Sequence, residues 1–215
     1  MNAPAAHELP CLAVVTCGPQ LEVALQTRQM KVASLVRLGG VAPRSTLLLA
    51  AVDLVVEDAG ISPADLATIV VSRGPGSFTG IRAGLATVAG LEAGIGARCV
   101  AYDSLLMLAA RCAGDGVVWS AQPGRRGEIY ARRFRLVAAG PPIPEADIEI
   151  MAVADAVRKG PWVAAESLDL GAAERASVAR SAAEGLLHLA AAGAPPDSFE
   201  PLYVEGPPVP RVAAD

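Results

Sequence analysis

The sequence has few aromatic residues, two histidines and no excess of positive charge. It contains two tryptophans, three tyrosines and three phenylalanines in 215 residues, which argues against a surface that stacks single-stranded nucleic acid. Lys and Arg number 18 against 22 Asp and Glu, a formal net charge of −4, so the overall charge indicates no basic face for nucleic acid. His7 and His188 form no HxxxH motif, so we expect no zinc or iron protease site and no other metal site.

Long apolar runs are also missing, although the mean hydropathy of +0.41 is high. The most apolar stretch, residues 47–56, contains Asp53 and is far shorter than the roughly 18 apolar residues that a membrane span needs. The first ten residues carry neither a basic region nor a long apolar region, so we expect a cytoplasmic protein without a secretory signal or membrane contact. The four cysteines, at 11, 17, 99 and 112, form no CxxC pair and are expected to be buried thiols rather than nucleophiles.

The order of apolar segments predicts an α/β fold with mixed sheets flanked by helices. We expect a disordered N-terminus over 1–10, a subdomain over 11–103, a smaller subdomain over 104–206 and a tail over 207–215. The first subdomain is predicted to hold three strands within 12–37, a helix from Ser45 or Thr46 to Ala59, a helical turn at 62–65, a strand at 67–72, a helix ending near Gly94 and a strand at 97–102. The second is predicted to hold a helix from Ser104 to Cys112, strands at 116–121 and 128–138, and helices at 153–159 and 174–192.

A glycine-rich loop between a predicted buried strand and a helix is the sharpest motif. It lacks the lysine of a P-loop and the spacing of GxGxxG. Two interpretations stay open: an anion site at the start of the helix, or a tight turn in which Ser77 or Thr79 caps the helix. The candidate residues of this loop are Arg73, Gly74, Gly76, Ser77, Thr79, Gly80 and Arg82.

The two long helices of the first subdomain are apolar on more than one side, which favours a partner surface. Small residues at helical spacing would let a partner helix approach closely, and glycine inside a helix costs about 1 kcal/mol relative to alanine. The alternative is that the helices pack only on each other and on the sheet. The candidate partner-binding residues are Leu48, Ala51, Val52, Val55, Ala83, Thr87, Gly90 and Gly94.

The only basic cluster comprises Arg125, Arg126, Arg132, Arg133 and Arg135. It is read either as a tRNA-binding patch or, as the acidic chain favours, as a solvated strand edge. In a strand, Arg133 and Arg135 would share one face and Arg132 would point to the other.

The string RGPGSFTGIRAGL at 73–85 closely resembles the signature of the TsaB (YeaZ) family. LAVV near the start, GRRGEIYARRF and the near-terminal PLYVE follow in the family's order. The resemblance implies the actin-like fold of sugar kinases and the Hsp70 ATPase domain. It further implies a non-catalytic subunit that forms a heterodimer with a TsaD-type enzyme. With a TsaE-type ATPase these proteins make the N6-threonylcarbamoyl group on adenosine 37 of tRNA, so tRNA would be met only through the complex.

The chain departs from the family at four places. Val15-Thr16 replaces an Asp-Thr pair, Pro123 replaces an aspartate, Arg44-Ser45 replaces a histidine, and Glu205 replaces a basic residue. Because acidic residues would hold the hydrated Mg²⁺ of an actin-like nucleotide site, the first two departures disfavour an adenine nucleotide, and no cofactor is expected. Two alternatives stay open: an autonomous actin-like phosphotransferase or ATPase, and a diverged paralogue that forms a homodimer through the same helices.

Overall fold

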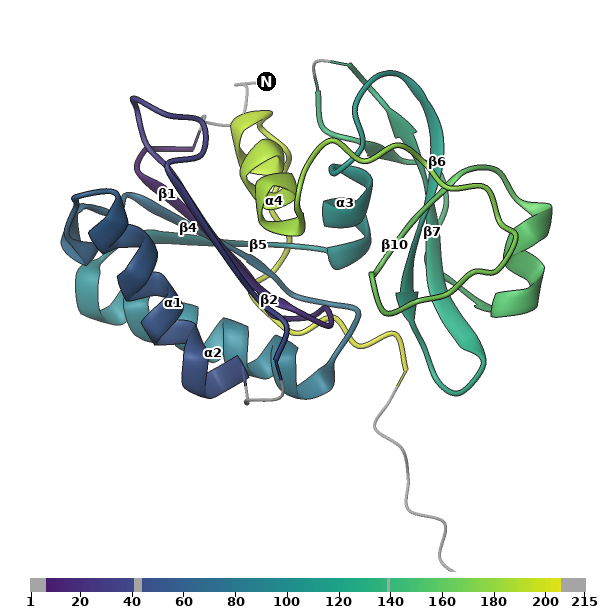
Figure 1. The fold of residues 1–215 in the computed structure, drawn as a ribbon, viewed down its shortest axis with the longest axis horizontal. Coiled ribbons are helices and arrows are strands. Elements are labelled where there is room, and N and C mark those ends of the chain that lie inside the picture. The colour runs from purple at the N-terminus through teal and green to yellow at the C-terminus, as the bar shows by residue number, and fades with distance from the viewer. Residues whose placement is uncertain (1–6, 41–43, 139, 206–215) are drawn as a thin grey trace, which may run out of the picture.

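The molecule has two lobes, each built on one mixed five-stranded sheet (Figure 1). The structure, a computed structural model, describes residues 7–40, 44–138 and 140–205. The first sheet has the order β3-β2-β1-β4-β5, with β1, β2 and β3 antiparallel and β1, β4 and β5 parallel. Its strands are β1 (Cys11–Val15), β2 (Leu21–Gln26), β3 (Ser34–Leu38), β4 (Thr68–Ser72) and β5 (Arg98–Tyr102).

The second sheet has the order β10-β6-β7-β8, and β9 also pairs with β7. Strand β10 runs parallel to β6, and the other pairs are antiparallel. The strands are β6 (Gly116–Pro123), β7 (Glu128–Leu136), β8 (Ile143–Pro144), β9 (Glu149–Ala152) and β10 (Trp162–Ala164), with the 3-10 helix η2 (Val153–Arg158) beside them. A small core in this lobe includes Trp119 and Trp162, whose rings lie 5.5 Å apart.

Helices cover both faces of the first sheet (Figure 1). On one face α1 (Arg44–Asp58) packs on β2 and β3, and α2 (Phe78–Ile95) packs on β4 and β5. On the other face lies α4 (Ala182–Ala191), while α3 (Ser104–Ala109) fills the space between α4 and the second sheet. Strands β1 and β4 are fully buried because both faces of the sheet are covered, which explains their continuous apolar sequences.

Serine caps fix where helices begin. Ser62 and Asp65 form a capping box on η1 (Pro63–Asp65), and Ser181 and Glu184 form another on α4. Each pairs a side-chain acceptor with one of the unpaired N–H groups of a helix start. No helix in the described part of the chain is long and apolar enough to cross a bilayer.

The structure confirms the α/β class, the three-stranded meander, the helical turn at 62–65 and the buried strand near 67–72. Several predictions were wrong. Helix α1 begins at Arg44, so Ser45 and Thr46 lie inside it rather than capping it, and α3 ends at Ala109 instead of Cys112. The segment 153–159 forms a 3-10 helix, and the strands β8, β9 and β10 were not predicted. Residues 1–6 of the predicted disordered N-terminus, and the predicted tail, lie outside the described residues.

Residues 174–181 were predicted to be helical but are extended. Their backbone follows the second sheet and α3: the Ala176 N–H donates to the Trp162 carbonyl, and the Ala179 and Arg180 N–H groups donate to the Arg111 carbonyl. Ser181 then starts α4. Because α4 packs on β1 and β2, the chain after 104 returns to the first lobe. The expected division into 11–103 and 104–206 therefore does not describe the two lobes.

Candidate functional site

The glycine-rich loop is packed against the turn that joins β1 and β2. A Cβ atom at Gly76 would overlap the Cys17 carbonyl, and one at Gly80 would overlap the Thr16 carbonyl. Gly74 has a positive φ of 106°, and a Cβ there would lie 2.7 Å from the Leu202 carbonyl oxygen. Glycine is required because backbone approaches backbone on two sides.

Hydrogen bonds hold the loop in this position. The Ser77 N–H donates to the Cys17 carbonyl at 2.8 Å, and the Ser77 hydroxyl accepts from the Gly80 N–H at 3.2 Å. The Ser104 hydroxyl donates to the Pro75 carbonyl. The capped-turn interpretation is thus confirmed with Ser77 as the cap, while Thr79 lies exposed in the first turn of α2.

The two arginines of the loop lie in different surroundings. Arg73 donates from its guanidinium to the Ser198 hydroxyl at 3.0 Å and lies 4.0 Å from the Asp197 carboxylate. Arg82 places its guanidinium 5.4 Å from the ring centroid of Phe78, and Phe78 stacks on Tyr203 at 5.1 Å. Both rings are nearly half exposed, at 49% and 42%. The sequence reasoning missed this aromatic pair because Tyr203 is remote in the chain.

Four of the residues proposed for partner contact are buried in the single chain. Leu48, Ala51, Val52 and Val55 on α1 are all at most 3% exposed and belong to the main core, so their assignment to a partner surface is wrong. They share the face of α1 that packs on the sheet. The apolar residues that α1 presents outward are instead Leu49 and Leu54, which are 52% and 53% exposed.

The small residues of α2 differ in their exposure along the helix. Ala83 and Thr87 are half-buried, whereas Gly90 and Gly94 are exposed. A Cβ atom at Gly84 would overlap the Thr16 hydroxyl, but one at Gly90 or Gly94 would meet no atom within 4 Å. Contacts among the described residues thus explain Gly84 but offer no reason for Gly90 or Gly94.

A cleft of about 380 Å³ lies between the lobes at the glycine-rich loop. Its lining contains no carboxylate; it comes from the β1–β2 turn, the loop, the end of β6 and Ser167. Val15 is buried and Pro123 is exposed at the cleft. Hydrated Mg²⁺ needs oxygen ligands such as carboxylates, so the residues lining this cleft do not fit the metal-bound nucleotide of an actin-like ATPase. Nor do three His, Cys, Asp or Glu side chains converge anywhere in the described ranges.

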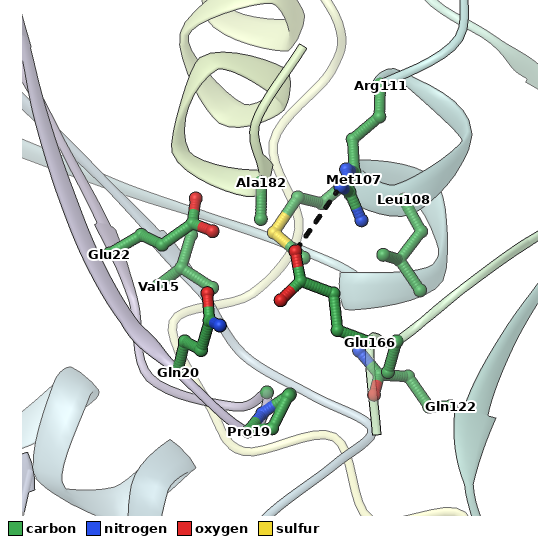
Figure 2. Close-up of a pocket in the computed structure, with 12 residues that line it drawn as sticks. Val15, Pro19, Gln20, Glu22, Met107, Leu108, Arg111, Gln122, Glu166 and Ala182 are labelled. Carbon is green, nitrogen blue, oxygen red and sulfur yellow. Dashed lines mark ion pairs between the residues drawn. The ribbon is translucent and has the colours of Figure 1, made fainter. Parts of the chain in front are cut away.

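A smaller cavity of about 30 Å³ shares Gly18, Pro19 and Gln122 with the cleft. Figure 2 shows the side chains that line it. Glu166 of the second lobe lies 3.8 Å from Arg111, which follows the end of α3, and 4.0 Å from Arg37 of β3. Gln20 and Gln122 both line the cavity, and each has a buried amide oxygen without a partner among the described residues. The cavity is large enough for a water molecule that would satisfy them.

The pKa shifts of the thiols and of His188 are those of buried side chains rather than of activated catalytic groups. Burial raises the pKa of Cys17, beside the cleft, to about 11 and that of Cys11 to about 12. Burial also raises the pKa of Cys112. Thiols held neutral at physiological pH are weak nucleophiles. Burial, together with nearby Arg180, lowers the pKa of His188 on α4.

Most of the basic cluster is neutralised by acids of the same chain. Arg133 and Arg135 both pair with Glu145, at 3.3 and 3.2 Å, while Arg132 pairs with buried Asp103 at 3.1 Å on the other face. The predicted division of faces is confirmed. The interpretation as a strand edge is wrong, because β7 is flanked by β6 on one side and by β8 and β9 on the other.

The chain is similar in sequence to known proteins. The family model described as TsaD, tRNA N6-adenosine threonylcarbamoyltransferase, matches residues 23–141, more than half of the chain. The tRNA threonylcarbamoyladenosine biosynthesis protein TsaB of Bacillus subtilis is 34% identical over 92 residues, which are 42% of this chain and 40% of that protein. An uncharacterized protein of Mycobacterium tuberculosis H37Rv is 38% identical over 77 residues, 36% of each chain.

Two solved structures share the fold over almost their whole length. YeaZ from Pseudomonas aeruginosa superposes with a TM-score of 0.68 at 23% identity, covering 90% of this chain and 99% of that one. A second structure from that organism, described as similar to peptidase YeaZ, gives a TM-score of 0.71 at 22% identity, covering 91% and 99%. The chain belongs to the family that the TsaD model describes, and TsaB and YeaZ proteins are among its relatives and structural neighbours. The expected actin-like fold of that family is confirmed, while the alignments span only about 40% of the curated TsaB relative.

Proposed function

We propose that this chain is a non-catalytic subunit of the machinery that makes N6-threonylcarbamoyladenosine at position 37 of tRNA. It forms a heterodimer with a TsaD-type enzyme and activates it, and it meets tRNA only within that complex, to which a TsaE-type ATPase also contributes. The names of the matching family model and of the Bacillus subtilis relative support the pathway. The observation that carries the heterodimer is the outer face of α1 and α2.

That outer face combines exposed leucines with a track of small residues. Leu49 and Leu54 are each about half exposed on α1, and α1 packs against α2. On α2 the exposed residues include Ala86, Ala89 and Gly90. Large apolar side chains together with positions that carry small side chains or none suit the ridges and grooves of a second helix pair.

Gly90 gives the strongest reason for a helical partner. It costs α2 about 1 kcal/mol relative to alanine, and no atom of the described residues occupies the space that a Cβ would take. A helix backbone approaching at this point would use the space. The TsaD model matches residues 23–141, a range that contains both helices. A TsaD-type partner would therefore bring an equivalent helix pair, and the two pairs would form a four-helix interface.

The absence of catalysis by this chain is supported by its chemistry. The cleft lining holds no carboxylate, and the pKa of Cys17 at its edge is raised to about 11 by burial. General acid–base and nucleophilic catalysis require a group that changes protonation near neutral pH or is activated by a neighbour.

The test is light scattering of the purified chain, alone and mixed with the TsaD-type protein of the same organism. We expect a one-to-one complex at micromolar concentration, and Gly90→Leu should abolish it because the new side chain fills the contact space. Gly160→Leu is the matched control, since Gly160 is exposed on the second lobe and also has open space at its Cβ.

Other outcomes would overturn the proposal. A homodimer that ignores the TsaD-type protein would indicate a self-associating paralogue that uses the same helices. Micromolar binding and turnover of MgATP by the isolated chain, measured by calorimetry and phosphate release, would indicate an autonomous ATPase instead. Binding of Gly90→Leu with unchanged affinity would move the interface away from α2.

A further inference from the structure

The last described segment of the chain, residues 197–205, crosses from the first lobe to the second. We name it the C-terminal strap. At its start the Asp197 N–H donates to the Ala101 carbonyl of β5 at 3.0 Å, and the Asp197 carboxylate accepts from the Asp103 N–H at 2.7 Å. Further along, the Leu202 N–H donates to the Arg73 carbonyl at 2.8 Å. The strap is thus fixed to the edge of the first sheet and to the glycine-rich loop.

The final residues of the strap contact both lobes. Tyr203 stacks on Phe78, in the first turn of α2. Two positions later the Glu205 carboxylate accepts a hydrogen bond from the Tyr130 hydroxyl at 2.8 Å and pairs with Arg125 at 3.2 Å. Tyr130 lies on β7, and Arg125 lies in the turn between β6 and β7. Side chains two residues apart therefore bind the two lobes on opposite sides of the cleft between them.

These two sides are the walls of the cleft between the lobes. Gly76 and Ser77 line it on the first lobe, directly before Phe78, and Pro123 and Gly124 line it on the second, directly before Arg125. The strap therefore joins the β6–β7 hairpin of one wall, through Glu205, to Phe78 beside the other wall, through Tyr203. The strap is a short connection between elements that are otherwise separated by the cleft.

We propose that the C-terminal strap is a tether that couples the exposed aromatic end of α2 to the β6–β7 hairpin and so sets the opening of the cleft. Displacing Tyr203 from Phe78 releases Glu205 from the hairpin, and releasing Glu205 loosens Tyr203 in turn. The contacts suit a reversible device, because a half-exposed aromatic pair and a solvent-accessible ion pair are each weak. A partner that covers Phe78 would act on the cleft through this tether; that consequence alone rests on the proposed function.

The tether is tested on the isolated full-length chain by hydrogen–deuterium exchange with mass spectrometry. Tyr203→Ala removes a contact made only with the first lobe, and the readout is exchange in the second lobe. The Gly124 and Glu128 amides close the hairpin turn, donating to the Glu128 and Arg125 carbonyls. We expect their exchange to become roughly threefold to tenfold faster, the range that loss of one aromatic contact gives.

Tyr203→Phe is the matched control, since it keeps the ring and should leave hairpin exchange unchanged. Unchanged hairpin exchange in Tyr203→Ala would overturn the tether. Amides of β4, which is fully buried, serve as the reference for global stability. If Tyr203→Ala also accelerates exchange in β4, Tyr203→Leu replaces it, and the same hairpin readout decides.

The coupling must also act in the opposite direction. Glu205→Gln and Tyr130→Phe each weaken the contact on the second lobe, and we expect faster exchange of the Leu202 amide on the first lobe. A change limited to the hairpin in these variants would overturn the tether and leave two independent contacts. Because the TsaD-type protein is absent, failure here is distinguishable from failure of the proposed heterodimer.

Discussion

The buried carboxylate of Glu22 on β2 accepts a hydrogen bond at 2.9 Å from the backbone N–H of Ala183, in the first turn of α4. The same carboxylate pairs with Arg37 of β3, also at 2.9 Å. A carboxylate at a helix N-terminus offsets the unpaired N–H groups and the helix dipole there. This contact fixes the returning C-terminal helix on the first sheet.

Removing that carboxylate should destabilise the whole first lobe. We expect Glu22→Ala to lower the free energy of unfolding by about 3 kcal/mol, because it leaves the buried Ala183 N–H without its acceptor and Arg37 without its partner. Glu22→Gln should cost less, since the amide oxygen can still accept from Ala183. Urea denaturation followed by circular dichroism measures both. A loss below about 0.5 kcal/mol in Glu22→Ala, the size of an ordinary surface substitution, would show that the contact contributes little.

Two glycines of the same helix should respond to alanine with opposite signs. Gly90→Ala should raise the free energy of unfolding by about 0.5–1 kcal/mol, because its Cβ enters open space and alanine is the better helix former. Gly84→Ala should lower it by about 1–3 kcal/mol, because the new methyl group overlaps Thr16. Thermal denaturation of the two variants side by side checks both values. Equal effects would contradict the contacts described for α2.

This pair of glycines also shows how far the sequence alone could lead. The hydrophobic pattern of the sequence predicts two helices with more apolar and small residues than packing on one sheet requires. It does not predict which face of each helix meets the sheet. On α1 the spacing of Leu48, Val52 and Val55 is that of a core-facing stripe, and the structure buries all three. Leu49 and Leu54 look equally apolar in the sequence. Only the position of α1 on β2 and β3 leaves them exposed.

The glycine-rich loop was predictable because its constraints are local. A strand, a turn and a serine-capped helix follow one another within about fifteen residues, and Ser77 caps the helix as expected. The aromatic contact of Phe78 with Tyr203 and the pairing of Glu205 with Arg125 join residues far apart in the chain. The same applies to β8 and β10, which have two and three residues. Such short strands owe their conformation to tertiary hydrogen bonds rather than to sequence periodicity.

The thiols should be inert while the protein is folded. Burial raises the pKa of Cys17 to about 11 and the pKa of Cys99 to about 12, so almost no thiolate exists at pH 8. We expect a disulfide reagent such as DTNB to label the native chain slowly and all four cysteines at once in urea. Rapid labelling of one thiol in the native chain would indicate a thiolate and would count against a non-catalytic role.

The junction between the lobes should make stability depend on pH through one carboxyl group. Asp103 is buried as the cap of α3. Burial raises the pKa of Asp103 to about 6, although the Leu105 N–H and the Arg132 guanidinium act to lower it. As pH rises from about 4 to 6, the unfolded chain releases this proton first and the folded chain retains it. The contribution of this group to stability is therefore greatest below about pH 4 and falls as pH rises.

Asp103→Asn isolates that contribution, because the amide oxygen can still accept from the Leu105 N–H and the side chain cannot titrate. The difference in unfolding free energy between the variant and the natural chain should shift in favour of the variant between pH 4.5 and pH 7, by about 2 kcal/mol. Other carboxylates titrate identically in both proteins and cancel in the difference. Urea denaturation at several pH values measures it. A difference that stays constant with pH would mean that the Arg132 guanidinium fully offsets the effect of burial on the pKa of Asp103. The Asp103–Arg132 pair would then join the lobes equally firmly at every pH in this range.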